Sequence, residues 1–178
     1  MKQDFEYVAE LITEFFNDSH IIGRFAFLEE WEVSGWETWL QVEFGYFLSN
    51  NHPSTSEWWR ETTLSMDGRK EKQKWQCRPD FIIRKKGWKK ESYVMLEIKQ
   101  AIKPHDCMNL LWNDLNKISK VKNSEIDARL KCGLAIFQAN HIQLQKTITD
   151  NELLRETTTG DVIGNTGFAY LLFYNEDF

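Results

Sequence analysis

The sequence predicts an α/β domain of the mixed α+β kind. We expect a central mixed sheet that contains an antiparallel three-stranded meander, with helices on both faces. Two observations predict this class. The chain has 178 residues, of which 42% are hydrophobic and 28% charged, which suits one compact domain. Helix-like and strand-like hydrophobic patterns also follow one another along the chain, without repeats or linkers.

Four helices are expected, at residues 3–17, from 35 or 36 to 48, from 106 to 122, and from 142 to 155. In the first, apolar side chains recur at helical spacing along one stripe. Ser34 is a suitable N-cap for the second helix, and the Asn-Asn-His-Pro run at 50–53 ends it. Leu111 and Leu115 belong to the apolar side of the third helix.

Five strands are expected, at residues 57–66, 74–84, 93–99, 130–139 and 167–174. The Asp67-Gly68 pair is typical of a tight hairpin turn, and Gly87 marks a second turn. The first three strands therefore form the antiparallel meander. The helix from 106 to 122 then leads to the fourth strand.

The sequence excludes several classes of protein. It contains no apolar run of the roughly 20 residues that cross a bilayer, and its N-terminus does not read as a secretory signal. Three cysteines, Cys77, Cys107 and Cys132, are too few and too scattered for a disulfide framework. We therefore expect a cytoplasmic protein with no membrane partner.

The charge is polarised along the chain, although its net value is -5. Between Arg69 and Lys90 lie ten basic residues against two acids, whereas the first 57 residues hold 11 acids against two basic residues. Phosphate-binding surfaces need such local basic excess. For the turn from Arg84 to Lys90, the alternative is a basic hairpin that prevents edge-to-edge aggregation.

A chemical motif lies in and after the basic segment. Pro79-Asp80 heads one strand, and Glu97-Ile98-Lys99 ends the next. Alternation along a strand puts Glu97 and Lys99 on one face, and the turn can bring Asp80 beside Glu97. Two carboxylates suit Mg²⁺, and Lys99 would orient or deprotonate a water or stabilise the transition state. The structural alternative is a turn aspartate and an exposed cross-strand ion pair.

Pro79, Asp80, Glu97 and Lys99 resemble the signature of the PD-(D/E)xK nuclease superfamily, which has the restriction-endonuclease-like fold. The resemblance covers about residues 36–140 and leaves 1–35 as an N-terminal helical extension of a single nuclease-like domain, 1–178. It implies that Asp80 and Glu97 ligate Mg²⁺, for which Mn²⁺ can substitute, with no small-molecule cofactor. It also implies that Lys99 is the base or the stabiliser. A glutamate on the preceding helix often completes such a site.

Two glutamates compete for that last position. Trp36, Leu40, Glu43 and Phe47 share one helix face, so Glu43 is the single charge on an apolar stripe. A buried carboxylate needs a partner such as a metal or a basic side chain, and Glu43 is therefore preferred as the auxiliary metal ligand. Glu37 is the competitor, and it can instead stabilise the helix N-terminus.

The leading hypothesis is a metal-dependent endodeoxyribonuclease with Asp80, Glu97, Lys99 and Glu43 in its site. Substrate DNA would be held through backbone contacts by Arg78, Arg84, Lys85, Lys86, Lys89, Lys90 and Lys117. For Lys117, an ordinary helix pair with Asp114 is the competing interpretation. Because one site cuts one strand, cutting both strands requires a homodimer or a larger complex.

Two alternatives stay open. The first is a catalytically silent module of the same fold that binds nucleic acid or docks on a protein partner, as an inhibitor or a complex subunit. Its motivation is the acidic first third of the chain, which would repel duplex DNA. The second is the same chemistry on RNA or on branched junctions, because no motif in the sequence identifies the nucleic acid.

Overall fold

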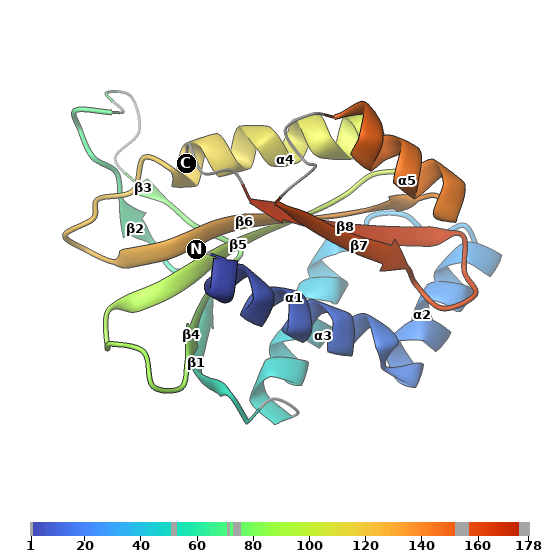
Figure 1. Cartoon of the computed structure of the whole chain (residues 1–178), viewed down its shortest axis with the longest axis horizontal. Coiled ribbons are helices and arrows are strands. Elements are labelled where there is room, and N and C mark those ends of the chain that lie inside the picture. Colours follow the sequence, from blue (N-terminus) through green and yellow to red (C-terminus); the bar gives the residue numbers. More distant parts are fainter. Residues whose placement is uncertain (1, 51–52, 71, 73–75, 152–156, 175–178) are drawn as a thin grey trace.

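The computed structural model describes residues 2–50, 53–70, 72, 76–151 and 157–174. Its elements, in chain order and as drawn in Figure 1, are α1 (Lys2–Asn17), α2 (Ser19–Glu30), α3 (Glu37–Asn50), β1 (Thr55–Arg60), β2 (Leu64–Ser65), β3 (Gln76–Cys77), β4 (Phe81–Lys85), β5 (Ser92–Gln100), α4 (Pro104–Ile118), β6 (Asp127–Gln138), α5 (His141–Asp150), β7 (Thr158–Val162) and β8 (Phe168–Tyr174).

Six strands form a mixed sheet in the order β1-β4-β5-β6-β8-β7. The pairs β1/β4, β4/β5, β6/β8 and β7/β8 are antiparallel, and β5/β6 is parallel. A parallel pair needs a long crossover connection, which α4 supplies. The expected antiparallel meander is therefore confirmed as β1, β4 and β5. Strands β2 and β3 form a separate two-stranded sheet.

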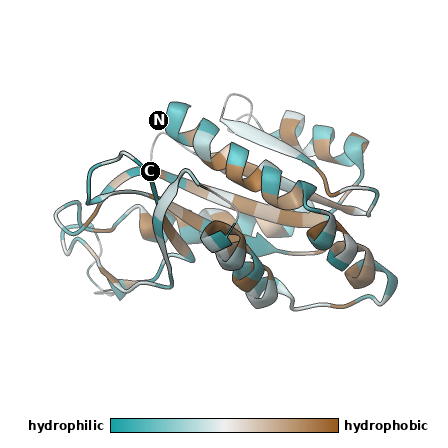
Figure 2. Cartoon of the chain, turned by 90° about the horizontal axis from the view of Figure 1, so that it is seen from below, coloured by the Kyte–Doolittle hydropathy of each residue, from teal (hydrophilic) through white to brown (hydrophobic). Residues whose placement is uncertain are grey.

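The helices cover both faces of the sheet, as expected. Helices α1, α2 and α3 lie on one face, and α4 and α5 lie on the other (Figure 1). Figure 2 shows hydrophobic residues concentrated along the central strands between these layers. Alternation along β5 sends Val94, Leu96 and Ile98 into the core under α1 to α3, and Tyr93 and Met95 into the core under α4. Glu97 and Lys99 continue the second set, toward α4.

The sequence patterns located most of these elements and missed two. The helix α2 is capped by Asp18, whose side chain accepts from the backbone N–H of His20, and it buries Ile21, Phe25 and Leu28 at helical spacing. The edge strand β7 has only half-buried or exposed side chains, so it carries no apolar alternation. Residues 152–155 of the expected last helix lie outside the described residues.

The expected strand at 74–84 is wrong as one element. It is divided into β3 and β4 by Arg78-Pro79-Asp80, because a proline has no N–H to donate to a ladder. Positions 74 and 75 lie outside the described residues. Asp67-Gly68 also does not close a two-residue turn, since Leu64 pairs with Cys77. The chain leaves β2 because Met66 bridges to Val121 instead.

Among the described residues, no helix is both long and apolar enough to cross a bilayer.

The contact of α4 with the sheet depends on a missing side chain at Gly133 in β6. A Cβ atom there would lie 2.8 Å from Cγ and Cδ2 of the fully buried Leu111. Gly133→Ala should therefore destabilise the fold by about 1–3 kcal/mol. The matched control is Gly23→Ala in α2, where nothing lies within 4 Å of the new Cβ and helix propensity favours alanine by up to about 1 kcal/mol. Urea unfolding that ranks the two variants equally would contradict this packing.

Candidate active site

The site forms where β5 extends beyond its neighbour β4. The paired register of β4 and β5 begins at Phe81 opposite Leu96, so no strand of the described residues pairs with β5 beyond Leu96 on that side. Side-chain carboxylates accept the hydrogen bonds that a neighbouring strand would otherwise accept. The N–H of Ile98 donates to Oδ2 of Asp80 over 2.7 Å, and the N–H of Gln100 donates to Oε2 of Glu37 over 3.2 Å. Buried backbone donors need such partners, which fixes Asp80 and Glu37 at the open edge.

Asp80 and Glu97 form a hydrogen-bonded pair of carboxyl groups. Glu97 is only 5% exposed. Burial, then the neighbouring charges of Asp80 and Asp114, raise the pKa of Glu97 to about 9. Burial also raises the pKa of Asp80, although the N–H of Ile98 and the ammonium of Lys99 oppose the shift. The pair therefore shares a proton at neutral pH, and Glu97 is the protonated donor.

The ammonium of Lys99 lies between two further carboxylates. Its Nζ is 3.1 Å from Oε1 of Glu37 and 3.3 Å from Oδ2 of Asp114, and its side chain is 21% exposed. Burial alone would lower the pKa of Lys99, but the charges of Glu37, Asp80 and Asp114 outweigh it and raise that pKa. Lys99 is therefore held as a cation, a state in which it cannot accept a proton.

These groups line a cavity of about 250 Å³. One wall comes from the β2–β3 region and another from α4, and its lining residues are Met66, Gln76, Cys77, Arg78, Asp80, Glu97, Lys99, Asp114, Lys117 and Ile118. Three groups at this cavity are cationic and three are carboxyls. The cationic side chains suit a negatively charged ligand such as a phosphate, and the carboxyl groups suit a metal cation. The cavity can therefore take a phosphate and a cation together.

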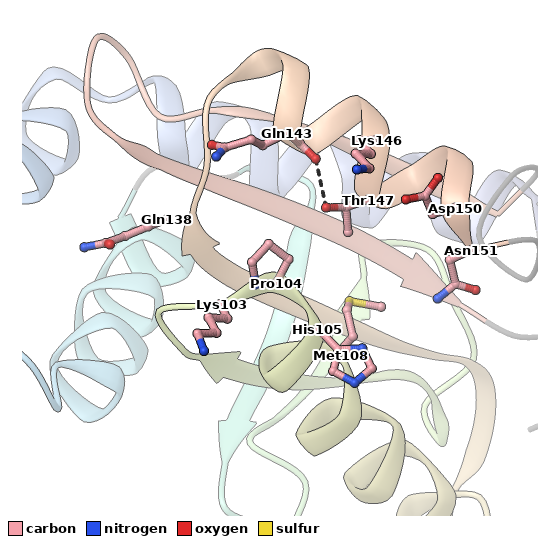
Figure 3. Close-up of a pocket in the computed structure, with 10 residues that line it drawn as sticks. All are labelled: Lys103, Pro104, His105, Met108, Gln138, Gln143, Lys146, Thr147, Asp150 and Asn151. Carbon is pink, nitrogen blue, oxygen red and sulfur yellow. Dashed lines mark hydrogen bonds between the residues drawn. The ribbon is translucent and has the colours of Figure 1, made fainter.

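A larger cavity, of about 580 Å³, lies between the start of α4 and α5 (Figure 3). Lys103, His105 and Lys146 contribute to its lining, and Asp150 is the one acidic residue among the described residues that line it. Because its described lining holds no pair of carboxyl groups, that lining does not offer the chemistry of the smaller cavity. Size alone therefore does not locate the candidate site.

The structure brings together three of the four expected site residues, Asp80, Glu97 and Lys99, and does not bring Glu43 to them. Oε1 of Glu43 accepts from Nε1 of Trp39 over 3.1 Å, and Oε2 lies 3.9 Å from Nε2 of His20. Glu43 thus faces α2, and its partners are an indole and an imidazole. The competitor Glu37 has the place at the site, because the first turn of α3 begins beside the end of β5.

Asp114 is a site residue that the sequence interpretation missed. The expected helix pair of Asp114 with Lys117 is present, but the other carboxylate oxygen of Asp114 contacts Lys99. A pair at i,i+3 is common on solvated helix faces, so the pattern gave no sign of the second contact. Only the placement of α4 over β5 reveals it.

The expected DNA-contacting residues separate into two groups. Arg78 and Lys117 line the cavity. The others lie toward the opposite end of β4 and β5, from about 13 Å to about 23 Å from Glu97 at a rise of about 3.3 Å per residue, and they are Arg84, Lys85, Lys86, Lys89 and Lys90. Arg84 is paired there with Glu57, and Nζ of Lys85 lies 4.9 Å from the ring centre of Tyr7. This second group therefore lies apart from the cavity, and its contact with DNA stays a prediction.

The residues present fit a divalent cation of the Mg²⁺ type. Among the described residues, no group of three or more His, Cys, Asp and Glu side chains is arranged to hold a metal. Mg²⁺, however, is usually held by one or two carboxylates together with waters and substrate phosphates. Two adjacent carboxylates repel each other, and here a shared proton relieves that repulsion. A metal cation could relieve it in place of the proton.

Comparisons of the chain with protein-family models, with curated proteins and with solved structures give no match. Any function for this chain therefore has to come from the geometry of its own residues.

Proposed function

We propose that this chain is a metal-dependent nuclease that hydrolyses DNA phosphodiester bonds at the site of Asp80, Glu97 and Lys99. The observation that carries the proposal is the hydrogen-bonded pair of carboxyl groups beside a lysine ammonium in one cavity. Perturbed titratable groups that meet in a cavity are typical of catalytic sites. Mg²⁺ is the proposed metal, and Mn²⁺ would substitute for it.

The arrangement of the elements supports the same proposal. The order α3, β1, β4, β5, α4, β6 follows the helix, meander, helix and strand that the PD-(D/E)xK resemblance implies. A restriction-endonuclease-like fold is the finer assignment that we propose for this mixed sheet. The β2–β3 hairpin is an insertion in that order, between β1 and β4.

The proposed roles differ between the four acids of the site. Asp80 and Glu97 would be the metal ligands, and Glu97 would release its shared proton when the cation binds. Glu37 already contacts Nζ of Lys99 and the N–H of Gln100, so we assign it, with Asp114, a positioning role. Glu43 has no role in this site.

In the proposed reaction the cationic side chains bind and orient the scissile phosphate. Lys99 would stabilise the negative charge that develops on it, because its two carboxylate partners keep it protonated. Arg78 and Lys117 would bind neighbouring phosphates at the cavity. When bound, Mg²⁺ would make the attacking water more acidic and would neutralise charge on the phosphodiester.

The test uses purified protein and supercoiled plasmid, with Mg²⁺ or with EDTA. We expect Mg²⁺-dependent nicking by the wild type and a loss of about 100-fold or more for Asp80→Asn, the scale for one main electrostatic contact in a catalytic site. Glu43→Gln is the matched control, since it neutralises an acid away from the site and should keep full activity. Equal nicking by the wild type and Asp80→Asn would show a contaminating nuclease.

A second candidate function is a silent module that docks on a protein partner. The exposed side chains of Glu6, Glu10 and Glu14 follow one another at four-residue spacing along α1 and favour a basic partner. Such a module would retain its function without the ammonium of Lys99. Lys99→Ala separates the two functions, because only a nuclease should lose activity with it.

A further inference from the structure

The β2–β3 hairpin forms an arm that lies beyond the end of α4 (Figure 1). Its base contributes Met66, Gln76, Cys77 and Arg78 to the wall of the cavity. The arm is joined to the segment after α4, because the N–H of Asp67 donates to the carbonyl of Lys120 over 2.8 Å. This backbone contact holds Asp67, in the described part of the arm, beside the segment that follows α4.

The arm and its support carry three lysines that form no ion pair within the part of the chain that the structure describes. Lys70 and Lys72 lie on the exposed part of the arm, and Lys122 is exposed where its N–H donates to the carbonyl of Ser65, over 3.0 Å. In the described part of the chain, no acidic side chain pairs with these three ammonium groups. The one arginine beside them, Arg69, is instead neutralised by Asp67.

Two of the ammonium groups in this region repel each other. Burial lowers the pKa of the half-buried Lys131 in β6, and the charge of the neighbouring Lys70 lowers it further. Like charges held close together raise the free energy of the protein. The carboxylate of Asp67, whose pKa is lowered by its hydrogen bonds to Arg69 and further by the charge of Lys70, is already paired with Arg69, so a bound polyanion would relieve the remaining repulsion. The arm therefore has the electrostatic character of an anion-binding surface.

We propose that Lys70, Lys72 and Lys122 hold the phosphate backbone of DNA on this arm, beside the candidate site. This inference rests on the proposed nuclease function and names its substrate-binding surface. Arg78 and Lys117 connect the two, because both line the cavity that contains Asp80 and Glu97. A strand bound along the arm would reach the carboxyl groups past these two cations.

The arm accounts for DNA binding better than the basic turn between β4 and β5 does. That turn holds Lys86, Lys89 and Lys90, which are also exposed. They lie at the far end of the strands from Glu97, about 20 Å away at the rise of a strand. The two lysine triplets have equal charge and similar exposure, so they form a matched comparison that differs in position.

The test measures DNA binding separately from cleavage. Two triple variants are made in the full chain that also carries Glu97→Gln. The arm triplet is Lys70→Gln, Lys72→Gln and Lys122→Gln. The control triplet is Lys86→Gln, Lys89→Gln and Lys90→Gln. Binding of a fluorescently labelled DNA duplex is measured by anisotropy in EDTA over a series of salt concentrations. We expect the arm triplet to weaken binding by tenfold or more and to reduce the salt slope by about three, one for each lost phosphate contact. The control triplet should change both quantities little.

The outcomes separate this inference from the proposed function. If the arm triplet weakens binding while the otherwise unaltered chain cleaves no DNA, the surface stands and the nuclease proposal fails. If the unaltered chain cleaves DNA and both triplets bind it equally well, the arm proposal is overturned and the nuclease proposal stands. Competition by poly-glutamate that matches unlabelled DNA would also overturn the arm proposal, because it would assign the surface to acidic proteins.

Discussion

Glu97→Gln should make the protein more stable at pH 8 while it abolishes cleavage. The amide keeps a donor toward Asp80, and it removes the cost of holding a buried acid protonated well above its ordinary pKa. Glu97 is a proposed metal ligand, so its loss should also remove the response to Mg²⁺. A more stable and inactive variant is the expected result when a strained pair of carboxyl groups is retained for function rather than for folding.

The stability gain should depend on pH in a defined direction. In the unfolded chain Glu97 has an ordinary pKa, about 4.3, whereas in the folded protein burial and Asp80 raise it to about 9. Between these two values the folded state binds more protons than the unfolded state, so the free energy of unfolding falls as pH rises. Below about pH 4 the acid is protonated in both states, and the advantage of glutamine should vanish.

Thermal unfolding at several pH values measures this effect. For a chain of this size, about 1 kcal/mol corresponds to a Tm change of about 2–4 °C, and we expect a gain of at least that size at pH 8. Added Mg²⁺ should raise the Tm of the wild type at pH 8 and leave that of Glu97→Gln unchanged. Glu43→Gln serves as the control acid. Parallel curves of Tm against pH for the wild type and Glu97→Gln would contradict the buried carboxyl pair.

The sequence was informative wherever a local pattern decides the structure. The alternation that put Glu97 and Lys99 on one face follows from strand geometry, and the structure keeps both residues on the α4 side of β5. The helical stripe in α1 was equally clear, because Tyr7, Leu11 and Phe15 must all be buried. Such features need only neighbours in the sequence.

Other features of the site depend on how elements pack, and no local pattern encodes that. Glu37 and Glu43 lie in the same helix, yet only Glu37 meets the open edge of β5. The choice between them was set by where the first turn of α3 ends against the sheet. Asp114 was missed for the same reason, since its contact with Lys99 crosses between α4 and β5. The basic segment from Arg69 to Lys90 is likewise divided in the structure between the arm and the turn that joins β4 to β5.

Lys99→Ala should separate catalysis from binding. If Lys99 stabilises charge on the scissile phosphate, the variant should lose about 100-fold or more in cleavage while its DNA affinity in EDTA stays within about twofold. A silent binding module would lose nothing, which distinguishes the second candidate function. Lys146→Ala, at an exposed position in α5, is the control for loss of one positive charge.

The same variant should be less stable, for a reason that a second substitution isolates. Without the ammonium, the carboxylates of Glu37 and Asp114 face one another across a half-buried space, which should cost about 1–3 kcal/mol in the free energy of unfolding. Adding Asp114→Asn to Lys99→Ala removes one of the two charges and should recover most of that loss in urea unfolding. Cleavage should not return, because the cation is still absent. Recovery of cleavage together with stability would mean that Lys99 only holds the fold, and the catalytic role proposed for it would then fail.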